Sequence, residues 1–207
     1  MALPQVEHFG ATRVAAVDTP PGVNVERGQM LETLLEWSTH CDDRYDIYCE
    51  IFGSETPVER IDDAVENVAL IRRKKRNVGA KLPIRGASST TIAYALSACS
   101  RLGVPAKAGP GIRFPVRPND GASHGILNLL TAAAIAFRDS DAHNAIVSAL
   151  EDDEATAFAL EDDALVWRER RFGAATITSM RHDLLLAFAA YRSSGPGEQL
   201  SELGVLK

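Results

Sequence analysis

The sequence has few cysteines, and none of its cysteines or histidines shows the spacing of a metal site. Its cysteines are Cys41, Cys49 and Cys99, an odd number with no CxxC pair. Its histidines are His8, His40, His124, His143 and His182, without an HxH or HExxH pattern. Such a set favours neither a disulfide framework nor a zinc site. We therefore expect no metal ion and a reducing compartment, the cytoplasm.

The common cofactor and hydrolase motifs are also absent. The sequence has no GxGxxG fingerprint, no P-loop and no GxSxG nucleophile elbow. These motifs mark dinucleotide binding, nucleotide triphosphate binding and serine hydrolases respectively. We expect no cofactor, and no serine hydrolase chemistry.

Long apolar runs and an excess of basic residues are lacking too. The start, "MALPQVEHFG", has no basic segment followed by an apolar one, and no stretch is long and apolar enough to span a bilayer. The net charge of −6 argues against a nucleic-acid-binding surface, which needs a basic footprint. The single dense basic run, residues 72–76, follows an apolar-periodic stretch and is typical of the last turn of a helix. We expect a soluble protein that binds neither nucleic acid nor membranes.

Strand-like and helix-like segments alternate along the first two thirds of the chain. The expected strands lie near 12–18, 46–52, 78–84 and 104–109. The expected helices pass through Met30, Leu31, Leu34 and Leu35, begin near Val58, and span about 89–102 and 122–137. This alternation predicts βα units on a parallel sheet, and hence an α/β fold. With 207 residues, we expect one domain, residues 1–207.

The C-terminal third has a different pattern. Two extended runs between 156 and 170 flank Asp162 and Asp163 and predict an antiparallel hairpin, or a last strand with an extension. Residues 174–192 then form an amphipathic pattern that predicts a helix. The tail that follows would pack through Leu200, Leu203 and Leu206.

Basic side chains gather where the expected strands end, which is where parallel α/β folds place their chemistry. Lys81 and Arg85 lie an even number of residues apart, so strand alternation puts them on one face. Lys107 belongs to the next strand, which right-handed crossovers place alongside. Such a cationic cluster requires a bound anion or a nearby acid, for which Glu50 is the candidate. The alternatives are a structural Glu50–Lys81 or Glu50–Lys107 ion pair, or exposed lysines on an edge strand.

Further polar residues follow the third and fourth strands. The segment "GASSTT" at the start of a helix would present free N–H groups to a phosphate or carboxylate, although Ser88 and Ser89 are also ordinary N-caps. Arg113 and Arg117 follow the fourth strand and add positive charge. The candidates for substrate binding are therefore Lys81, Arg85, Arg113, Arg117, Ser88 and Asn128.

His124 and Asn128, four residues apart, are expected on the opening turns of the next helix and on one face. His124 is a candidate acid or base, with a cap or packing role as the alternative. The candidate catalytic residues are thus Lys107, Glu50 and His124.

Several segments resemble an uncharacterised bacterial family of TIM-barrel-like proteins. "KAGPGIRFPVR" followed by "HGILNLLTAAAIA" is similar to that family's motif pair "GVPFKATAGLHHPVR…HGFLNVLLAAALA". "VGAKLPIRG", "DIYCEIF" and "DDALVWRERRFG…EQLSELGVL" resemble its other motifs in the same order, over about residues 45–207. The resemblance implies kinship without a reaction. Where the family has a threonine and two histidines after the lysine, this chain has Gly109, Arg113 and Phe114, which disfavours a histidine acid or base there.

Members of that family look longer at the N-terminus, by about three further βα units. By this comparison the chain begins near the fourth strand of a barrel, as a partial barrel with open strand edges. Open edges expose unpaired main-chain groups and are normally covered. The resemblance therefore implies a homo-oligomer or a complementary partner subunit.

Two classes of function follow. The first is an enzyme of the lyase, aldolase or isomerase kind that acts on a small anionic carbonyl metabolite, with Lys107 as Schiff-base amine or as base. The second is a non-catalytic subunit or metabolite-binding protein that completes a barrel with a partner. Trapping with borohydride discriminates between them, because only a Schiff-base enzyme is covalently labelled.

Overall fold

The central feature of the computed structural model is an open parallel β-sheet. The structure describes residues 16–18, 32, 36, 46–53, 56–74, 77–121 and 123–190. The strands are β1 (Ala16–Asp18), β2 (Asp46–Glu50), β3 (Val78–Leu82), β4 (Ala106–Ile112) and β8 (Leu185–Ala190), in the order β1-β2-β3-β4-β8. All neighbouring pairs are parallel. The predicted α/β fold is confirmed, as an open sheet and not a closed barrel.

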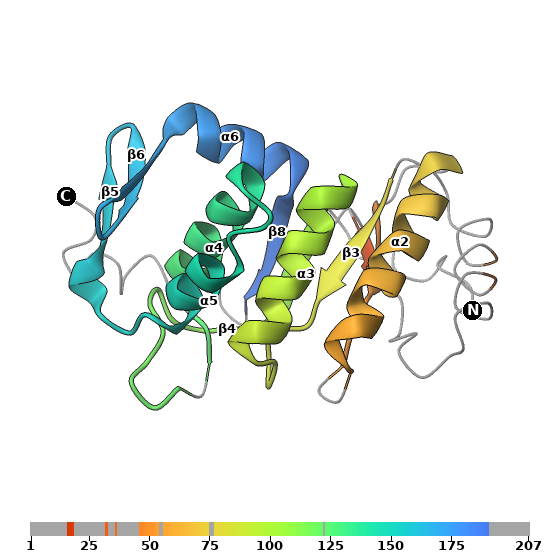
Figure 1. Cartoon of the computed structure of the whole chain (residues 1–207), viewed down its shortest axis with the longest axis horizontal. Helices are drawn as coiled ribbons and strands as arrows, with labels where there is room; N and C mark the ends of the chain where they lie inside the picture. Colours follow the sequence, from red (N-terminus) through yellow and green to blue (C-terminus); the bar gives the residue numbers. More distant parts are fainter. Residues whose placement is uncertain are drawn as a thin grey trace, which may run out of the picture.

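The helices pack along one face of this sheet. They are α2 (Val58–Lys74), α3 (Ser89–Leu102), α4 (Ile126–Arg138), α5 (His143–Glu151) and α6 (Ala174–Asp183). Figure 1 shows α2, α3 and α4 side by side, with β3 and β8 visible between them. Consecutive parallel strands in sequence order, joined by right-handed crossovers, place their helices on a single face.

Along each strand, alternate side chains point to opposite faces of the sheet. Ile47 and Cys49 of β2 belong to the buried apolar cluster that includes the helix residues, as do Val78, Ala80 and Leu82 of β3. On α2 the buried residues Ile61, Ala64, Val65, Val68 and Ile71 recur at helical spacing. The strand residues between those core positions therefore face away from the helices.

A small antiparallel sheet follows the helical region. It contains β5 (Phe158–Glu161), β6 (Ala164–Trp167) and β7 (Arg170–Gly173), in that order. The pair β5–β6 turns at Asp162 and Asp163, so the predicted hairpin is confirmed. A short 3-10 turn, Ala155–Ala157, precedes it.

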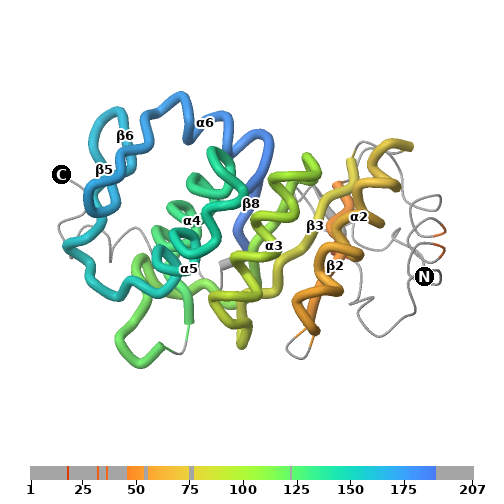
Figure 2. Tube along the Cα trace, in the orientation of Figure 1, coloured from red at the N-terminus to blue at the C-terminus, as the bar shows by residue number. Residues whose placement is uncertain are grey.

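The predicted helix over 174–192 is wrong beyond Asp183. The helix α6 ends there, and the apolar run Leu185–Ala190 forms β8, paired with β4. Figure 2 follows the trace from α6 back into the sheet as β8. A continuous apolar run has no alternation, so its sequence pattern fits a buried strand of a parallel sheet as well as a buried helix.

One helix begins later than expected, and one helix was not expected. The helix α4 begins at Ile126 and not near 122, because Gly125 is its extended N-cap, so His124 lies just before the helix. The helix α5 was not predicted. The predicted strand residues 12–15, the predicted helix residues Met30, Leu31, Leu34 and Leu35, and the tail with Leu200, Leu203 and Leu206 lie outside the described residues. Within the part that the structure describes, no helix has the length and apolar character needed to cross a membrane.

Candidate functional site

Four charged side chains meet on the face of the sheet that lies opposite the helices. Asp18 and Glu50 are the last residues of β1 and β2, and Lys81 is the penultimate residue of β3. Lys107 is the register partner of Lys81, which is in turn the partner of Glu50. The register of parallel strands thus brings these residues together near the carboxyl edge. We call Asp18, Glu50, Lys81 and Lys107 the ion-pair cluster.

The contacts in the ion-pair cluster link four neighbouring strands, β1 to β4. Lys81 Nζ lies 2.9 Å from Glu50 Oε2 and 3.5 Å from Asp18 Oδ2. Lys107 Nζ lies 2.8 Å from Asp18 Oδ1. One carboxylate therefore joins both lysines, with a separate oxygen directed to each.

The ion-pair cluster is shielded without being sealed. The exposed fractions of the side chains are 13% for Lys81, 14% for Glu50, 18% for Lys107 and 31% for Asp18. Partial exclusion of water strengthens the attraction between the charges, whereas the remaining exposure leaves the groups reachable. The two carboxylates balance the two ammonium groups.

Tyr48 lies beneath Lys107 on the same face. Its ring is buried, and the ring centroid is 5.5 Å from Lys107 Nζ, a distance at which an ammonium is attracted to an aromatic face. Burial raises the pKa of Tyr48, and the nearby carboxylates of Asp46 and Asp18 raise it further. Gly79 makes room for the ring, because an added Cβ would approach the Tyr48 ring within 3.1 Å and Pro105 O within 2.6 Å.

The cationic side chains gather only in part. Lys81 and Lys107 share the ion-pair cluster, and Glu50 pairs with Lys81 as one alternative foresaw. Arg85 lies beyond the end of β3 and is exposed; its main-chain N donates to Pro110 O at 3.1 Å. Asp18 is the member whose role the sequence reasoning missed. Its signal was an acidic residue directly after the first strand.

Arg117 and His124, in the loop after β4, and Ser89, the first residue of α3, form a second polar cluster. Arg117 Nη1 lies 3.3 Å from His124 Nδ1 and 3.4 Å from Ser89 Oγ. His124 is buried, and its Nε2 is 3.1 Å from Ala87 O. A neutral ring with its proton on Nε2 satisfies both contacts by donating to Ala87 O and accepting from Arg117. This geometry favours a structural tie between loops.

The pKa of His124 is lowered, chiefly because burial disfavours the charged ring; the Arg117 guanidinium adds to this, while bonds to the main-chain oxygens of Ala87 and Leu150 oppose it. The folded state therefore takes up its proton at lower pH than the unfolded state does. Above about pH 6.5, His124 should have no pH-dependent effect on the free energy of unfolding. Below that pH, the free energy of unfolding should fall by up to about 1.4 kcal/mol per pH unit, until the ring protonates in the folded state as well.

Urea unfolding of the wild type and of His124→Gln at several pH values between 5 and 7.5 tests this expectation. Because glutamine does not titrate, the variant should lose part of the acid-induced decline whatever its stability at neutral pH. Parallel stability curves for the two proteins would contradict the assignment.

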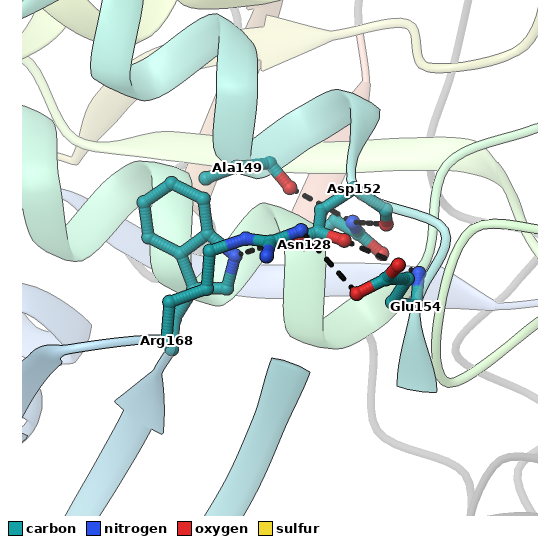
Figure 3. Close-up of polar contacts among 6 residues, drawn as sticks. Asn128, Ala149, Asp152, Glu154 and Arg168 are labelled. Carbon is teal, nitrogen blue, oxygen red and sulfur yellow. Dashed lines mark hydrogen bonds and ion pairs between the residues drawn. The ribbon is translucent and has the colours of Figure 1, made fainter. Parts of the chain in front are cut away.

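Asn128, in the first turn of α4, is fully buried and its amide is fully used. Its Oδ1 accepts from Arg117 N at 2.8 Å, and its Nδ2 donates to Ala149 O at 2.8 Å and to Asp152 O at 2.7 Å. Figure 3 shows this amide beside Asp152, at the end of α5. Gly125 permits the approach, because a Cβ there would lie 2.4 Å from Asn128 Oδ1.

The Asp152 carboxylate continues this network toward the small sheet. Asp152 Oδ2 accepts from Trp167 Nε1 and from Arg168 Nε, both at 2.8 Å. Arg168 also lies 3.6 Å from Glu154 (Figure 3). The network therefore connects α5 and β6 to the start of α4 through hydrogen bonds between its own polar groups.

The remaining predicted residues lie at the same edge of the sheet. Ser88 is the N-cap of α3, and its Oγ accepts from Thr91 N at 3.0 Å. Arg113 follows β4 directly and is exposed. Among the described residues, no group of three or more His, Cys, Asp or Glu side chains is arranged to hold a metal ion.

The described cysteines are unsuited to nucleophilic chemistry at this edge. Cys49 is buried in the apolar cluster, and so is Cys99. Burial raises the pKa of the Cys99 thiol to about 12, so it stays protonated at neutral pH. Cys41 lies outside the described residues. Among the described residues, Lys81 and Lys107 are the amines on the open face of the sheet.

Comparison with known proteins assigns no family to this fold and site. No family model matches the chain, and neither a curated protein nor a solved structure gives a significant match. The resemblance to the uncharacterised bacterial family stays a prediction.

Proposed function

We propose that this protein is an enzyme of the lyase, aldolase or isomerase type, which acts on a small carbonyl metabolite with a phosphate or carboxylate group. The supporting observation is the position of Lys107. Its amine lies 2.8 Å from Asp18 on the sheet face opposite the helices, near the edge where parallel α/β proteins place their sites.

In this proposal Lys107 is the amine that attacks the substrate carbonyl and forms a Schiff base. A nucleophilic lysine needs a group that takes its proton and a surrounding that limits water. One carboxylate of the ion-pair cluster supplies the first, and the low exposure of the cluster supplies the second. Glu50 holds Lys81, whose ammonium lies on the neighbouring strand beside the reacting amine.

The anionic group of the substrate is assigned to the loops beyond the strands. Arg85 and Arg113 are exposed there, and Ser88 is the N-cap of α3, whose first N–H groups favour anions. The proposal also assigns Arg117, at the same edge of the sheet, to binding of the anionic group. His124 and Asn128 are assigned a structural role, since their polar atoms contact main-chain groups and Arg117.

Borohydride trapping tests the proposal. The wild type is incubated separately with aldehyde phosphates, keto acids and neutral hydroxyaldehydes, and is then reduced with borohydride. The mass of the intact protein is measured by mass spectrometry. One adduct per chain, formed at low concentration with selected anionic carbonyls, is expected. Equal, slow labelling by all members, at the level of a Lys107→Ala control, would contradict it.

A second candidate function, a non-catalytic subunit or metabolite-binding protein that completes a barrel, is favoured by the open sheet. Among the described residues, β1 pairs only with β2, and β8 pairs only with β4. Exposed strand edges leave main-chain donors and acceptors without partners and are normally covered. This candidate predicts binding of an anion without covalent labelling.

Both candidates include self-association or a partner subunit at these edges. A stable interface should bury more than about 1,000 Å², so a homo-oligomer is expected at micromolar concentration. Sedimentation velocity gives the measurement. The protein is measured from about 1 μM to a concentration 100-fold higher, a range that spans typical dissociation constants of oligomers. A species of 22.3 kDa at every concentration would exclude self-association.

A further inference from the structure

We propose that Asp18 is the proton carrier of the site, which takes the proton from Lys107 and returns it to the leaving oxygen; this inference rests on the proposed function. The Asp18 carboxylate is the acid in contact with Lys107, with Oδ1 at 2.8 Å from Nζ. Glu50, by contrast, contacts Lys81 at 2.9 Å. Among the described residues, Asp18 thus contacts both lysines, whereas Glu50 is paired with Lys81, and the proposal gives the two acids different roles.

The charge arrangement supports the transfer. When the proton moves from Lys107 to Asp18, an ion pair becomes a neutral pair, and Lys81 keeps Glu50 as its counter-ion. Among the described residues, the polar groups that face Lys107 are Asp18 from β1, Tyr48 and Glu50 from β2 and Lys81 from β3. On β8 its register partner is the uncharged Ala187. Partial shielding from water lowers the cost of the neutral state relative to the charged one.

The chemical step balances with Asp18 as carrier. The Lys107 ammonium gives one proton to Asp18, and the neutral amine forms a C–N bond with the carbonyl carbon. A second nitrogen proton moves to the former carbonyl oxygen. Asp18 then returns its proton to that oxygen, the C–O bond breaks, and water leaves. The products are a protonated imine on Lys107, one water and the Asp18 carboxylate, with no oxidant or reductant.

The test separates amine reactivity from imine formation. Acetic anhydride labels Lys107 in proportion to its neutral fraction, whereas borohydride trapping with a carbonyl that labels the wild type reports imine formation. Both are followed against pH by peptide mass spectrometry in the wild type, Asp18→Asn and the matched control Glu50→Gln. Circular dichroism verifies that each variant is folded.

In Asp18→Asn, we expect Lys107 to be acetylated more readily at a given pH but to be trapped more slowly. Loss of the neighbouring carboxylate should move the acetylation profile of Lys107 to lower pH by about one unit or more. Loss of the proton carrier should nevertheless slow trapping at neutral pH by about 100-fold. Asp18→Glu, which keeps a carboxylate, should recover most of the trapping, and Glu50→Gln should leave the acetylation profile of Lys107 in place.

The other outcomes would overturn either the role of Asp18 or the proposed function. Trapping in Asp18→Asn that stays equal to the wild type, or rises with acetylation, would overturn the role of Asp18. If Asp18→Asn does not fold, Asp18→Ser is measured in its place with the same expectations. If no carbonyl labels the wild type, the proposed function fails. The acetylation profiles then still decide whether Asp18 controls the charge of Lys107.

Discussion

Substitution of Lys107 by alanine is expected to abolish covalent trapping, with a loss of at least about 100-fold relative to the wild type, as expected when a nucleophile is removed. Lys107→Arg should be equally inactive, because a guanidinium keeps the positive charge beside Asp18 but forms no imine under these conditions. The measurement is the fraction of protein that gains the mass of the reduced adduct.

Two controls separate chemistry from folding. Lys74→Ala removes an exposed lysine from the last turn of α2 and should trap like the wild type. Lys107→Arg should also unfold in urea close to the wild-type midpoint, because the Asp18 ion pair is retained. Trapping by Lys107→Ala at the wild-type rate would contradict the assignment of the reacting amine.

The largest expected effect on stability is that of Asn128→Leu. This change leaves Arg117 N, Ala149 O and Asp152 O without their partners in a fully buried place. Each unsatisfied buried group costs about 1–3 kcal/mol, so a loss of roughly 3–5 kcal/mol is expected. Urea unfolding followed by circular dichroism measures it.

Asn67→Leu is the matched control on α2. Asn67 is also buried, at 3% exposure, but its Nδ2 has no hydrogen-bond partner among the described residues. Replacing this amide by an apolar side chain of similar size removes an unsatisfied group, so the free energy of unfolding should stay level or rise. Equal losses in both variants would show that Asn128 acts through its volume and not through its hydrogen bonds.

The βα order was predictable because its signals are local. The alternating residues of β2 and β3, and the cap at Ser88 with the left-handed Gly103 at the other end of α3, mark their elements within a few residues. The β5–β6 hairpin was likewise marked by Asp162 and Asp163 between two extended runs. Each of these features depends on short-range backbone preferences.

The strand β8 was missed because its environment is not local. Its residues are apolar without alternation, and the preceding helix pattern continues into them; only pairing with β4 makes them a strand. The sheet thereby extends by one strand beyond β4, the last strand predicted for it. Tertiary pairing here outweighs the pattern of the sequence.

The composition of the site was predictable in part for the same reason. The right-handed crossover between neighbouring strands placed Lys107 beside Lys81, and Glu50 was identified as a partner. Asp18 was not paired with them, because its contact with Lys107 spans 89 residues and depends on the neighbouring register of β1 and β2. Arg85 was expected on the face of Lys81, but β3 ends at Leu82, so alternation no longer applies to it.

The position of the adduct in the wild-type protein tests the central claim most directly. After incubation with a carbonyl that labels the intact chain, reduction and digestion with trypsin, the added mass should lie on the peptide 102–113, which keeps a missed cleavage at Lys107 because a modified lysine resists trypsin. An adduct on Lys81 or Lys74, or turnover of the same compound with Lys107 unmodified, would contradict the account.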